Sequence, residues 1–458
     1  MRKAALAGVV AVAAIGGVVA AMVLSSRGGG DGQAAPPTAS TTVGTARSTA
    51  PATTQAPTTT AATTTRAATT TSRHTTPGAP IPTRPVKLPP PPSPRSVKRQ
   101  SFVVGTVDDS LAQQSPQFAQ AQVDSSRDAG FDAAIVSAAW QRGQRRPTPA
   151  ALSVFRNVAR ATARDRMELI VVVWHGLARE TPRSPSDRAD FAAFAAALVR
   201  SLPQVEAVIV GNEPNLSTFW KPQFGAGGTD AAAHAYEDLL ARSYDAVKAA
   251  RPDVEVIGGA LSPRGADRPN GSRPTHSPTR FLYDLGVAYR ASGRTKPLMD
   301  AFAIHPYMQA SRDSPAAAHP DNTTITLADY PKLVRLLDAA FRGTHQEAAK
   351  LPVYYTEFGV QTPVPGSKRR FYSDLGSPTR SDSVSFATQA AYYRRALELA
   401  YCQPTVRGLF IFHTFDEASL YGWQSGLYFA DRTPKPSLPA FKRAVSDLRN
   451  GRFPACGG

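Results

Sequence analysis

Two glutamates lie in short motifs whose residue types could carry acid–base chemistry. Glu213 occurs in the sequence GNEPN and Glu357 in YTEFG, each at the end of a strongly apolar run. Cleavage of a glycosidic bond requires one carboxyl group that gives a proton to the leaving oxygen. It also requires a second, ionised carboxyl group that attacks or stabilises the sugar cation. Glutamate can fill both roles because the surroundings of each side chain set its pKa, so the two motifs indicate glycosidic chemistry.

Eight short apolar runs must position these residues. The runs are rich in β-branched residues and do not alternate with polar ones, which is typical of strands covered on both faces. They cover residues 101–107, 131–138, 168–174, 206–212, 254–260, 300–307, 351–359 and 406–415. The segments between them, such as 188–202 and 235–250, have apolar residues at helical spacing. Eight strand–helix units predict a (β/α)8 TIM barrel, whereas an open doubly wound sheet would need a Gly-rich loop after its first strand.

The ends of these runs hold the candidate site residues, because active sites of (β/α)8 barrels lie at the C-terminal ends of the strands. Carboxylates, amides and aromatic rings gather there, and aromatic rings suit packing against the C–H groups of sugars. The candidates are Trp174, His175, Asn212, Glu213, His305, Tyr307, Glu357 and, after the last run, Asp416 and Trp423. We expect most of them to meet at one mouth of the barrel.

The motifs around the two glutamates resemble those of glycoside hydrolase clan A. This group contains cellulases, mannanases, β-xylosidases and related retaining enzymes, and the resemblance covers residues 100 to about 445. The clan pattern has its acid/base glutamate in Asn-Glu-Pro at strand four and its nucleophile at strand seven. The resemblance therefore implies a glycosidase in which Glu213 is the acid/base and Glu357 the nucleophile, with no cofactor.

The same resemblance implies roles for neighbouring residues. Asn212 would hydrogen-bond the sugar 2-hydroxyl. His305 and Tyr307 match a His-x-Tyr of cellulase-like members, in which the tyrosine orients the nucleophile. Trp423 lies where a sugar-stacking tryptophan often follows strand eight. The pair Trp174 and His175 is compatible with the wall of a sugar subsite.

Structural interpretations of these residues stay open at this point. Asn212 and Pro214 could begin a helix, since Asn favours the N-cap and Pro the first turn. His305 could be a buried structural histidine, Tyr307 an ordinary aromatic of the rim, and Trp423 a residue of the core.

Other polar residues near strand ends also have two interpretations. Asp108 and Asp109 follow the first run and could be ordinary loop acids, while Asp416 could bind a sugar hydroxyl. A metal site would need histidines from three different strands to come together, and we expect none. Those histidines are His175, His305 and His413.

The first 100 residues differ from the rest of the chain. Arg2 and Lys3 precede an uncharged apolar run over residues 4–24, which is typical of an export signal and long enough to span a membrane. We expect residues 1–26 to be an uncleaved signal anchor, with a cleaved signal peptide as the alternative. Residues 27–99 are rich in Thr, Ala and Pro and have too few large apolar residues to fold, so we expect a disordered stalk. The catalytic domain would occupy residues 100–458.

Charge and cysteine content give two further indications about an exported, membrane-anchored or secreted protein: one about its partners and one about a disulfide. Residues 1–100 hold eleven of the 52 Lys and Arg residues and a single acidic residue, Asp31. The chain has no basic stripe interleaved with aromatics, the pattern that would indicate nucleic-acid binding. The chain has two cysteines, Cys402 and Cys456, which would form a disulfide in an oxidising compartment or else remain buried thiols.

The sequence as a whole predicts a retaining glycoside hydrolase that acts outside the cytoplasm. Its partner would be an extracellular polysaccharide or a cell-envelope glycan. Two alternatives remain: a transglycosidase that remodels glycan, and a barrel that binds glycan without catalysis.

Overall fold

The computed structural model describes residues 102–346, 351–376, 382–453 and 456. The predicted signal anchor (1–26) and stalk (27–99) lie outside the described residues. Within the described part of the chain, no helix is both long and apolar enough to cross a membrane.

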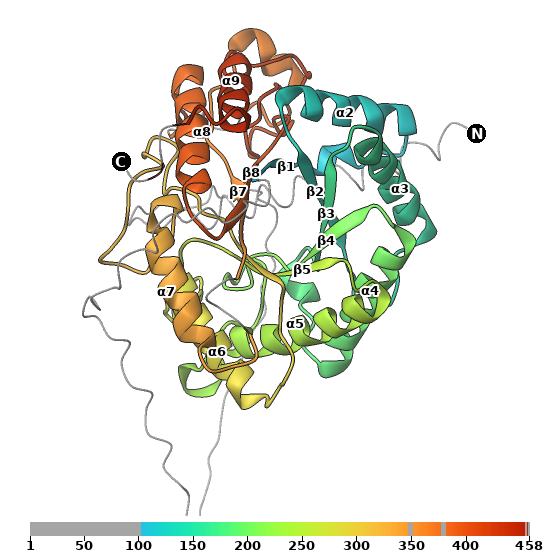
Figure 1. Ribbon diagram of the computed structural model, residues 1–458, viewed down its shortest axis with the longest axis vertical. Coiled ribbons are helices and arrows are strands. Elements are labelled where there is room, and N and C mark those ends of the chain that lie inside the picture. The colour runs from blue at the N-terminus through green and yellow to red at the C-terminus, as the bar shows by residue number, and fades with distance from the viewer. Residues whose placement is uncertain (1–101, 347–350, 377–381, 454–455, 457–458) are drawn as a thin grey trace, which may run out of the picture. The chain divides into compact units, whose positions relative to one another are not determined.

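The described residues form a closed barrel of parallel strands, in which each strand pairs with the next and β1 pairs with β8. The helices lie as a ring outside the strands (Figure 1). The strands are β1 (Val103–Val107), β2 (Ala133–Ala139), β3 (Glu168–Trp174), β4 (Val205–Val210), β5 (Glu255–Leu261), β6 (Ala301–Ile304), β7 (Val353–Phe358) and β8 (Val406–Ile411). The helices are α2 (Pro116–Ala129), α3 (Pro149–Arg164), α4 (Pro185–Ser201), α5 (Ala231–Ala250), α6 (Pro278–Ala291), α7 (Tyr330–Phe341), α8 (Phe386–Tyr401) and α9 (Leu438–Arg449). The predicted (β/α)8 barrel is confirmed.

β6 and β8 end three and four residues, respectively, before the ends of the apolar runs that predict them. β6 ends at Ile304 rather than at residue 307, and β8 ends at Ile411 rather than at residue 415. The residues beyond each strand are nevertheless buried, among them Tyr307 and Phe412. Apolar character alone does not distinguish a strand from a buried loop, so the runs overestimate both strands at the mouth of the barrel.

Alternate residues of each strand enter two different cores. On β3, Ile170, Val172 and Trp174 belong to the cluster inside the barrel. Val171 and Val173 belong to the larger cluster between the strands and the helices. Side chains of a strand alternate between its two faces, so a continuous apolar run fills both cores at once. The last inward residue of such a strand lies at the mouth of the barrel.

Local sequence signals start several of the helices. Thr148, Ser184 and Ser277 are N-cap residues whose hydroxyl oxygens accept hydrogen bonds from backbone N–H groups of α3, α4 and α6, respectively. A proline follows each of them at the first position of the helix, where a missing N–H has no cost. These caps fix where each loop at the mouth ends and its helix begins.

A disulfide joins the C-terminal tail to the barrel. Cys402, which caps the C-terminus of α8, is bonded to Cys456. The pairing predicted from the two cysteines is therefore observed.

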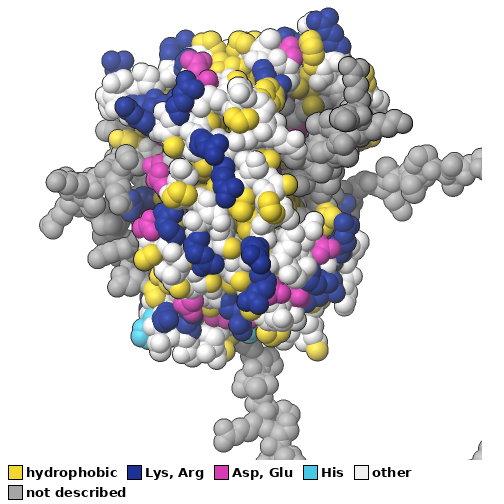
Figure 2. Space-filling model, turned by 90° about the vertical axis from the view of Figure 1, so that its right-hand side faces the viewer, with side chains coloured by type: hydrophobic (Ala, Val, Ile, Leu, Met, Phe, Trp, Pro, Cys, Tyr) yellow, Lys and Arg dark blue, Asp and Glu magenta, His cyan; other side chains and the backbone are white. Residues whose placement is uncertain are grey.

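The helical surface carries a mixed charge pattern. On the face shown in Figure 2, Lys and Arg side chains are separated by apolar and uncharged side chains, with acidic ones among them. Arg145 lies 3.5 Å from Asp190, and Arg142 lies 3.7 Å from Asp187. This pattern is typical of a solvated helix face and does not favour a nucleic-acid interface.

Candidate active site

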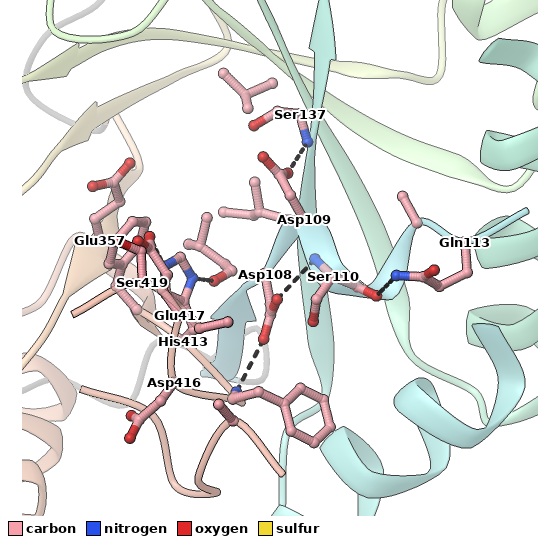
Figure 3. A pocket seen from close by; sticks show the side chains of 18 of the residues that line it. Asp108, Asp109, Ser110, Gln113, Ser137, Glu357, His413, Asp416, Glu417 and Ser419 are labelled. Carbon is pink, nitrogen blue, oxygen red and sulfur yellow. Dashed lines mark hydrogen bonds and ion pairs between the residues drawn. The ribbon is translucent and has the colours of Figure 1, made fainter. Parts of the chain in front are cut away.

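A cavity of about 720 Å³ lies at the C-terminal ends of the strands. Inward residues of the barrel such as Ile135, Val172 and Ile209 contribute to its lining. Polar residues from the loops after β1, β7 and β8 form much of the rest (Figure 3). The cavity thus has an apolar base and a polar rim, as expected of a small-molecule site.

Glu357 lines this cavity from the end of β7. Its Oε2 atom accepts a hydrogen bond of 3.0 Å from the hydroxyl group of Tyr307, and the residue is 8% exposed. Burial raises the pKa of Glu357, the nearby charge of Glu213 raises it further, and His305 opposes both effects. The tyrosine therefore holds one oxygen of the carboxylate in place.

Glu213 follows β4 on an irregular segment of backbone. Its φ angle is 40°, in the left-handed region that residues other than glycine rarely adopt. The backbone N–H of Glu213 donates to the carbonyl of Ala260 on β5 at 2.9 Å, which helps hold this conformation. The next helix, α5, begins only at Ala231, so the interpretation of Asn212 and Pro214 as a helix start is wrong. Strained backbone held by its surroundings is found at functional sites.

His305 joins the two glutamates. Its Nδ1 atom lies 3.1 Å from Oε1 of Glu213 and 3.5 Å from Oε2 of Glu357. These two oxygens can therefore be no farther apart than about 6.6 Å, the sum of the two distances, which is compatible with the separation of about 5–5.5 Å in retaining glycosidases. Burial lowers the pKa of His305, but the charges of Glu357 and Glu213 outweigh it, so the pKa lies above its ordinary value.

The two glutamates differ in their access to the cavity. Glu213 is 3% exposed, and it is not among the residues that line the cavity. Its Oε2 atom is buried and has no hydrogen-bond partner within the described residues. Arg264 is a charged neighbour of Glu213, and its guanidinium donates to the carbonyl groups of Tyr307 and Met308, each at 3.0 Å. Glu213 is therefore covered on the side of the β5 and β6 loops.

The predicted sugar-binding residues separate into two groups. Asn212 and Trp174 line the cavity. His175 does not, because its ring packs edge-on against Trp220 at 5.5 Å, and its Nδ1 atom lies 3.1 Å from the carbonyl of Leu177. Burial lowers the pKa of His175 to about 4, so it is a neutral structural residue at pH 7.

Trp423 does not have the position that sugar stacking requires. Its side chain is fully buried, and its ring lies 5.0 Å from that of Tyr307 and 5.5 Å from that of Phe412. The loop after β8 places this tryptophan in the inner core of the barrel, against the tyrosine that contacts Glu357. The expectation that Trp423 stacks on a sugar is therefore wrong, and its ring instead packs against Tyr307.

Two of the loop acids have structural partners. Both oxygens of Asp108 accept backbone N–H groups, Oδ1 from Ser110 and Oδ2 from Thr414 and Phe415. Asp416 forms a buried ion pair of 2.7 Å with Lys435 and accepts a hydrogen bond of 2.8 Å from Tyr372. These contacts favour a structural role for both acids over sugar binding.

The sequence interpretation missed Glu417, which lines the cavity beside His413 (Figure 3). Oε1 of Glu417 lies 3.1 Å from Nε2 of His413, and Nδ1 of that histidine lies 2.5 Å from the carbonyl of Val107. Burial lowers the pKa of His413, but Glu417 and Asp108 outweigh it and raise the pKa to about 9. His413 and Glu417 lie on an irregular loop after β8, where a spacing of four residues does not bring side chains together as it does on a helix, so no sequence signal indicated this pair. Within the described residues, no group of three or more His, Cys, Asp or Glu side chains is arranged to hold a metal ion.

Comparison with known proteins supports the architecture. No protein-family model matches the sequence, and no curated protein matches it significantly. The β-glycosidase BGL167 has a similar structure, with a TM-score of 0.50 and 16% identity over 78% of this chain and 98% of the other. The GH5_18 protein from Streptomyces cattleya, solved with GlcNAc, has a TM-score of 0.51 and 16% identity over 78% of this chain and 82% of the other. The AHE enzyme from Alicyclobacillus herbarius has a TM-score of 0.50 and 16% identity over 77% of this chain and 98% of the other. At this identity the likeness concerns the fold, and it agrees with the (β/α)8 barrel.

Proposed function

We propose that this protein is a retaining glycoside hydrolase with Glu213 as acid/base and Glu357 as nucleophile. The observation that carries the proposal is that both carboxylates lie within 3.5 Å of the same nitrogen of His305 at one mouth of the barrel. The likeness of the fold to that of a β-glycosidase is a further support.

The first step of the proposed reaction uses the two carboxylates differently. Oε1 of Glu357 attacks the anomeric carbon while Tyr307 holds Oε2, and the bond from that carbon to the leaving oxygen breaks. Glu213 gives its proton to the leaving oxygen, and the alcohol departs. The sugar is then joined to Glu357 as an ester. We assign the transferred proton to Oε2 of Glu213, because that atom has no other partner within the described residues.

The second step reverses the roles of proton donor and acceptor. Glu213, now ionised, takes a proton from a water molecule, whose oxygen attacks the anomeric carbon. The ester bond breaks, and Glu357 returns as a carboxylate. Two displacements at the same carbon give a product with the configuration of the substrate. His305 holds both carboxylates in place throughout, because its Nδ1 atom lies within 3.5 Å of an oxygen of each.

The proposed substrate is a polysaccharide or glycan outside the cytoplasm. The support is the export signal predicted from residues 1–26, together with the disulfide between Cys402 and Cys456, which forms stably in oxidising compartments. A membrane anchor and a secreted form both agree with this location.

Covalent trapping tests the proposed reaction. The full chain is incubated with activated 2-deoxy-2-fluoro β-glycosides, and its intact mass is recorded before peptide mapping. We expect a stable adduct on Glu357, and no adduct with the Glu357→Gln variant. An adduct on another residue would refute the assignment of the nucleophile. Binding of the glycosides without any turnover would indicate a non-catalytic barrel, whereas products larger than the substrate would indicate a transglycosidase.

A further inference from the structure

One side of the cavity is built from the ends of β1, β2 and β3. We call Asp109, Ser137 and Trp174 the polar wall; all three line the cavity. Ser137 and Trp174 are inward positions of neighbouring strands, since Ser137 pairs with Val172 and Trp174 lies two residues further along β3. Asp109 begins the short helix η1 (Asp109–Leu111) directly after β1. None of these side chains has a part in the proposed proton transfers.

Asp109 is held in a defined orientation. Its Oδ1 atom accepts a hydrogen bond of 2.6 Å from the backbone N–H of Ser137, and its carboxyl group faces the cavity (Figure 3). Burial raises the pKa of Asp109, and the hydrogen bonds from Ser137 and the charge of His413 oppose this effect. Within the described chain, no lysine or arginine forms an ion pair with it. A fixed acceptor of this kind suits the hydroxyl group of a ligand.

Unpaired donors lie at the same cavity. Trp174 is 2% exposed, and its Nε1 atom has no hydrogen-bond partner within the described residues. Thr356, next to Glu357 on β7, also lines the cavity with a buried, unpaired hydroxyl group. Buried polar groups without partners are unfavourable and uncommon, so unpaired donors in a cavity indicate a polar ligand.

The charges around the cavity restrict the kind of ligand. Among the described residues that line it, Arg432 is the one lysine or arginine. Its guanidinium lies 4.6 Å from the ring of Phe118 and 5.6 Å from that of Phe415, in the loop region rather than at the polar wall.

Two histidines of the cavity, His305 and His413, have a pKa above the ordinary value, but each is already paired with a glutamate, Glu213 and Glu417 respectively. The polar wall itself offers one carboxylate acceptor and one indole donor, and no unpaired cation that could neutralise an acidic ligand belongs to it.

We propose that Asp109 and Trp174 bind neighbouring hydroxyl groups of a sugar ring, and that the polar wall selects neutral sugars over uronates. Asp109 accepts a hydrogen bond from one hydroxyl, and Nε1 of Trp174 donates to another. A uronate would bring its carboxylate near the carboxylate of Asp109, while the nearby charge of His413 is already paired with Glu417, so the two carboxylates would repel each other. This assignment rests on the proposed function in taking the ligand to be a sugar.

Substrate selectivity tests the polar wall. The full chain and its Asp109→Asn and Trp174→Phe variants are assayed with p-nitrophenyl β-glucoside, β-mannoside, β-xyloside and β-glucuronide. We expect the wild type to prefer a neutral glycoside. Each variant should lose about 10- to 100-fold in kcat/KM for that glycoside, as for a lost hydrogen bond to a charged or buried group, and much less for the glucuronide. Trp140→Phe is the matched control, because Trp140 belongs to the cluster between the strands and the helices and its Nε1 atom donates to the carbonyl of Gln144.

A binding measurement separates this proposal from the proposed hydrolysis. The Glu357→Gln variant, alone and combined with Asp109→Asn, is titrated with the same four glycosides by calorimetry, and melting temperatures confirm folding. The polar wall would be supported if Glu357→Gln bound a neutral glycoside more tightly than the glucuronide and if Asp109→Asn weakened that binding. This result would count even if the wild type cleaved none of the four glycosides. Preference for the glucuronide, unchanged selectivity in both wall variants, or no binding of any of the four would overturn it.

Discussion

Glu213 and Glu357 end strands of the same barrel but have different surroundings. Glu357 belongs to β7, lines the cavity, and has one oxygen held by Tyr307. Glu213 lies beyond the last residue of β4, is covered by the β5 and β6 loops, and has an oxygen without a partner in the described chain. The strand β7 therefore positions the carboxylate of Glu357, whereas the segment after β4 and the neighbouring loops position that of Glu213.

This difference suits the two proposed roles. A nucleophile must be aimed at one carbon atom, so a regular strand and a hydrogen bond from a fixed tyrosine help it. An acid/base must exchange a proton with the leaving oxygen and with water, so a carboxyl oxygen without a fixed partner is an advantage. The following variants test this division from the largest expected effect to the smallest.

Replacement of Glu357 should have the largest effect. In Glu357→Ala, we expect kcat to fall at least about 10⁴-fold, the scale seen when an enzyme nucleophile is removed. The measurement is steady-state hydrolysis of a dinitrophenyl β-glycoside. Added azide should restore part of the rate and give a glycosyl azide of inverted configuration, because the small anion attacks from the side of the missing carboxylate. Restoration with retained configuration would show that Glu357 is not the nucleophile.

Replacement of Glu213 should have an effect that depends on the leaving group. In Glu213→Ala, we expect kcat/KM to fall about 10²- to 10⁴-fold for alkyl glycosides, whose leaving oxygen needs a proton. The loss should be much smaller for dinitrophenyl glycosides, whose leaving group departs without one. Azide should here give a product of retained configuration. Equal losses for both leaving groups would contradict the role of Glu213 as the acid.

Removal of the hydroxyl group of Tyr307 should have a smaller effect. Tyr307→Phe loses the hydrogen bond to Oε2 of Glu357, so we expect kcat/KM to fall about 10- to 100-fold, as for a hydrogen bond to a charged group. Tyr354→Phe is the matched control, since its hydroxyl group donates to Glu255 near the start of β5 rather than at the mouth. A loss of the same size in both variants would assign Tyr307 to stability rather than to catalysis.

The sequence predicts the barrel and the pairing of the two glutamates because both depend on short-range patterns. Apolar runs define the strands, and in a (β/α)8 fold the C-terminal ends of all strands lie at the same mouth of the barrel. The structure accordingly brings Glu213, His305, Tyr307 and Glu357 into contact with one another.

The remaining parts of the site depend on the paths of long loops. Trp423 follows β8 in sequence, and no local pattern distinguishes a tryptophan at the mouth from one folded into the barrel. Glu417 and Asp109 acquire their roles from contacts with His413 and Ser137, which are set by the tertiary fold. Sequence reasoning therefore identified residues at or just beyond the strand ends more reliably than residues whose contacts depend on the long loop after β8.

The smallest expected effect concerns His413, in the loop after β8. It is measured as the pH dependence of the free energy of unfolding. Folding raises the pKa of His413 from 6.5 to about 9, because Glu417 and Asp108 outweigh its burial. The native state then binds this proton more tightly than the unfolded chain does. The resulting stability is fully present below pH 6.5 and is lost as the pH rises through about 9.

We therefore expect the free energy of unfolding of the wild type to fall by a few kcal/mol at most between pH 6.5 and 9.5, since one pKa unit corresponds to about 1.4 kcal/mol. Urea unfolding at a series of pH values measures this slope. His413→Gln should flatten it. His175→Gln should leave it unchanged, because the pKa of His175 is about 4 and that residue stays neutral throughout the range. A slope that persists in His413→Gln would mean that this histidine does not hold its proton through the contact with Glu417, and the carboxylate would then be free to contact the substrate.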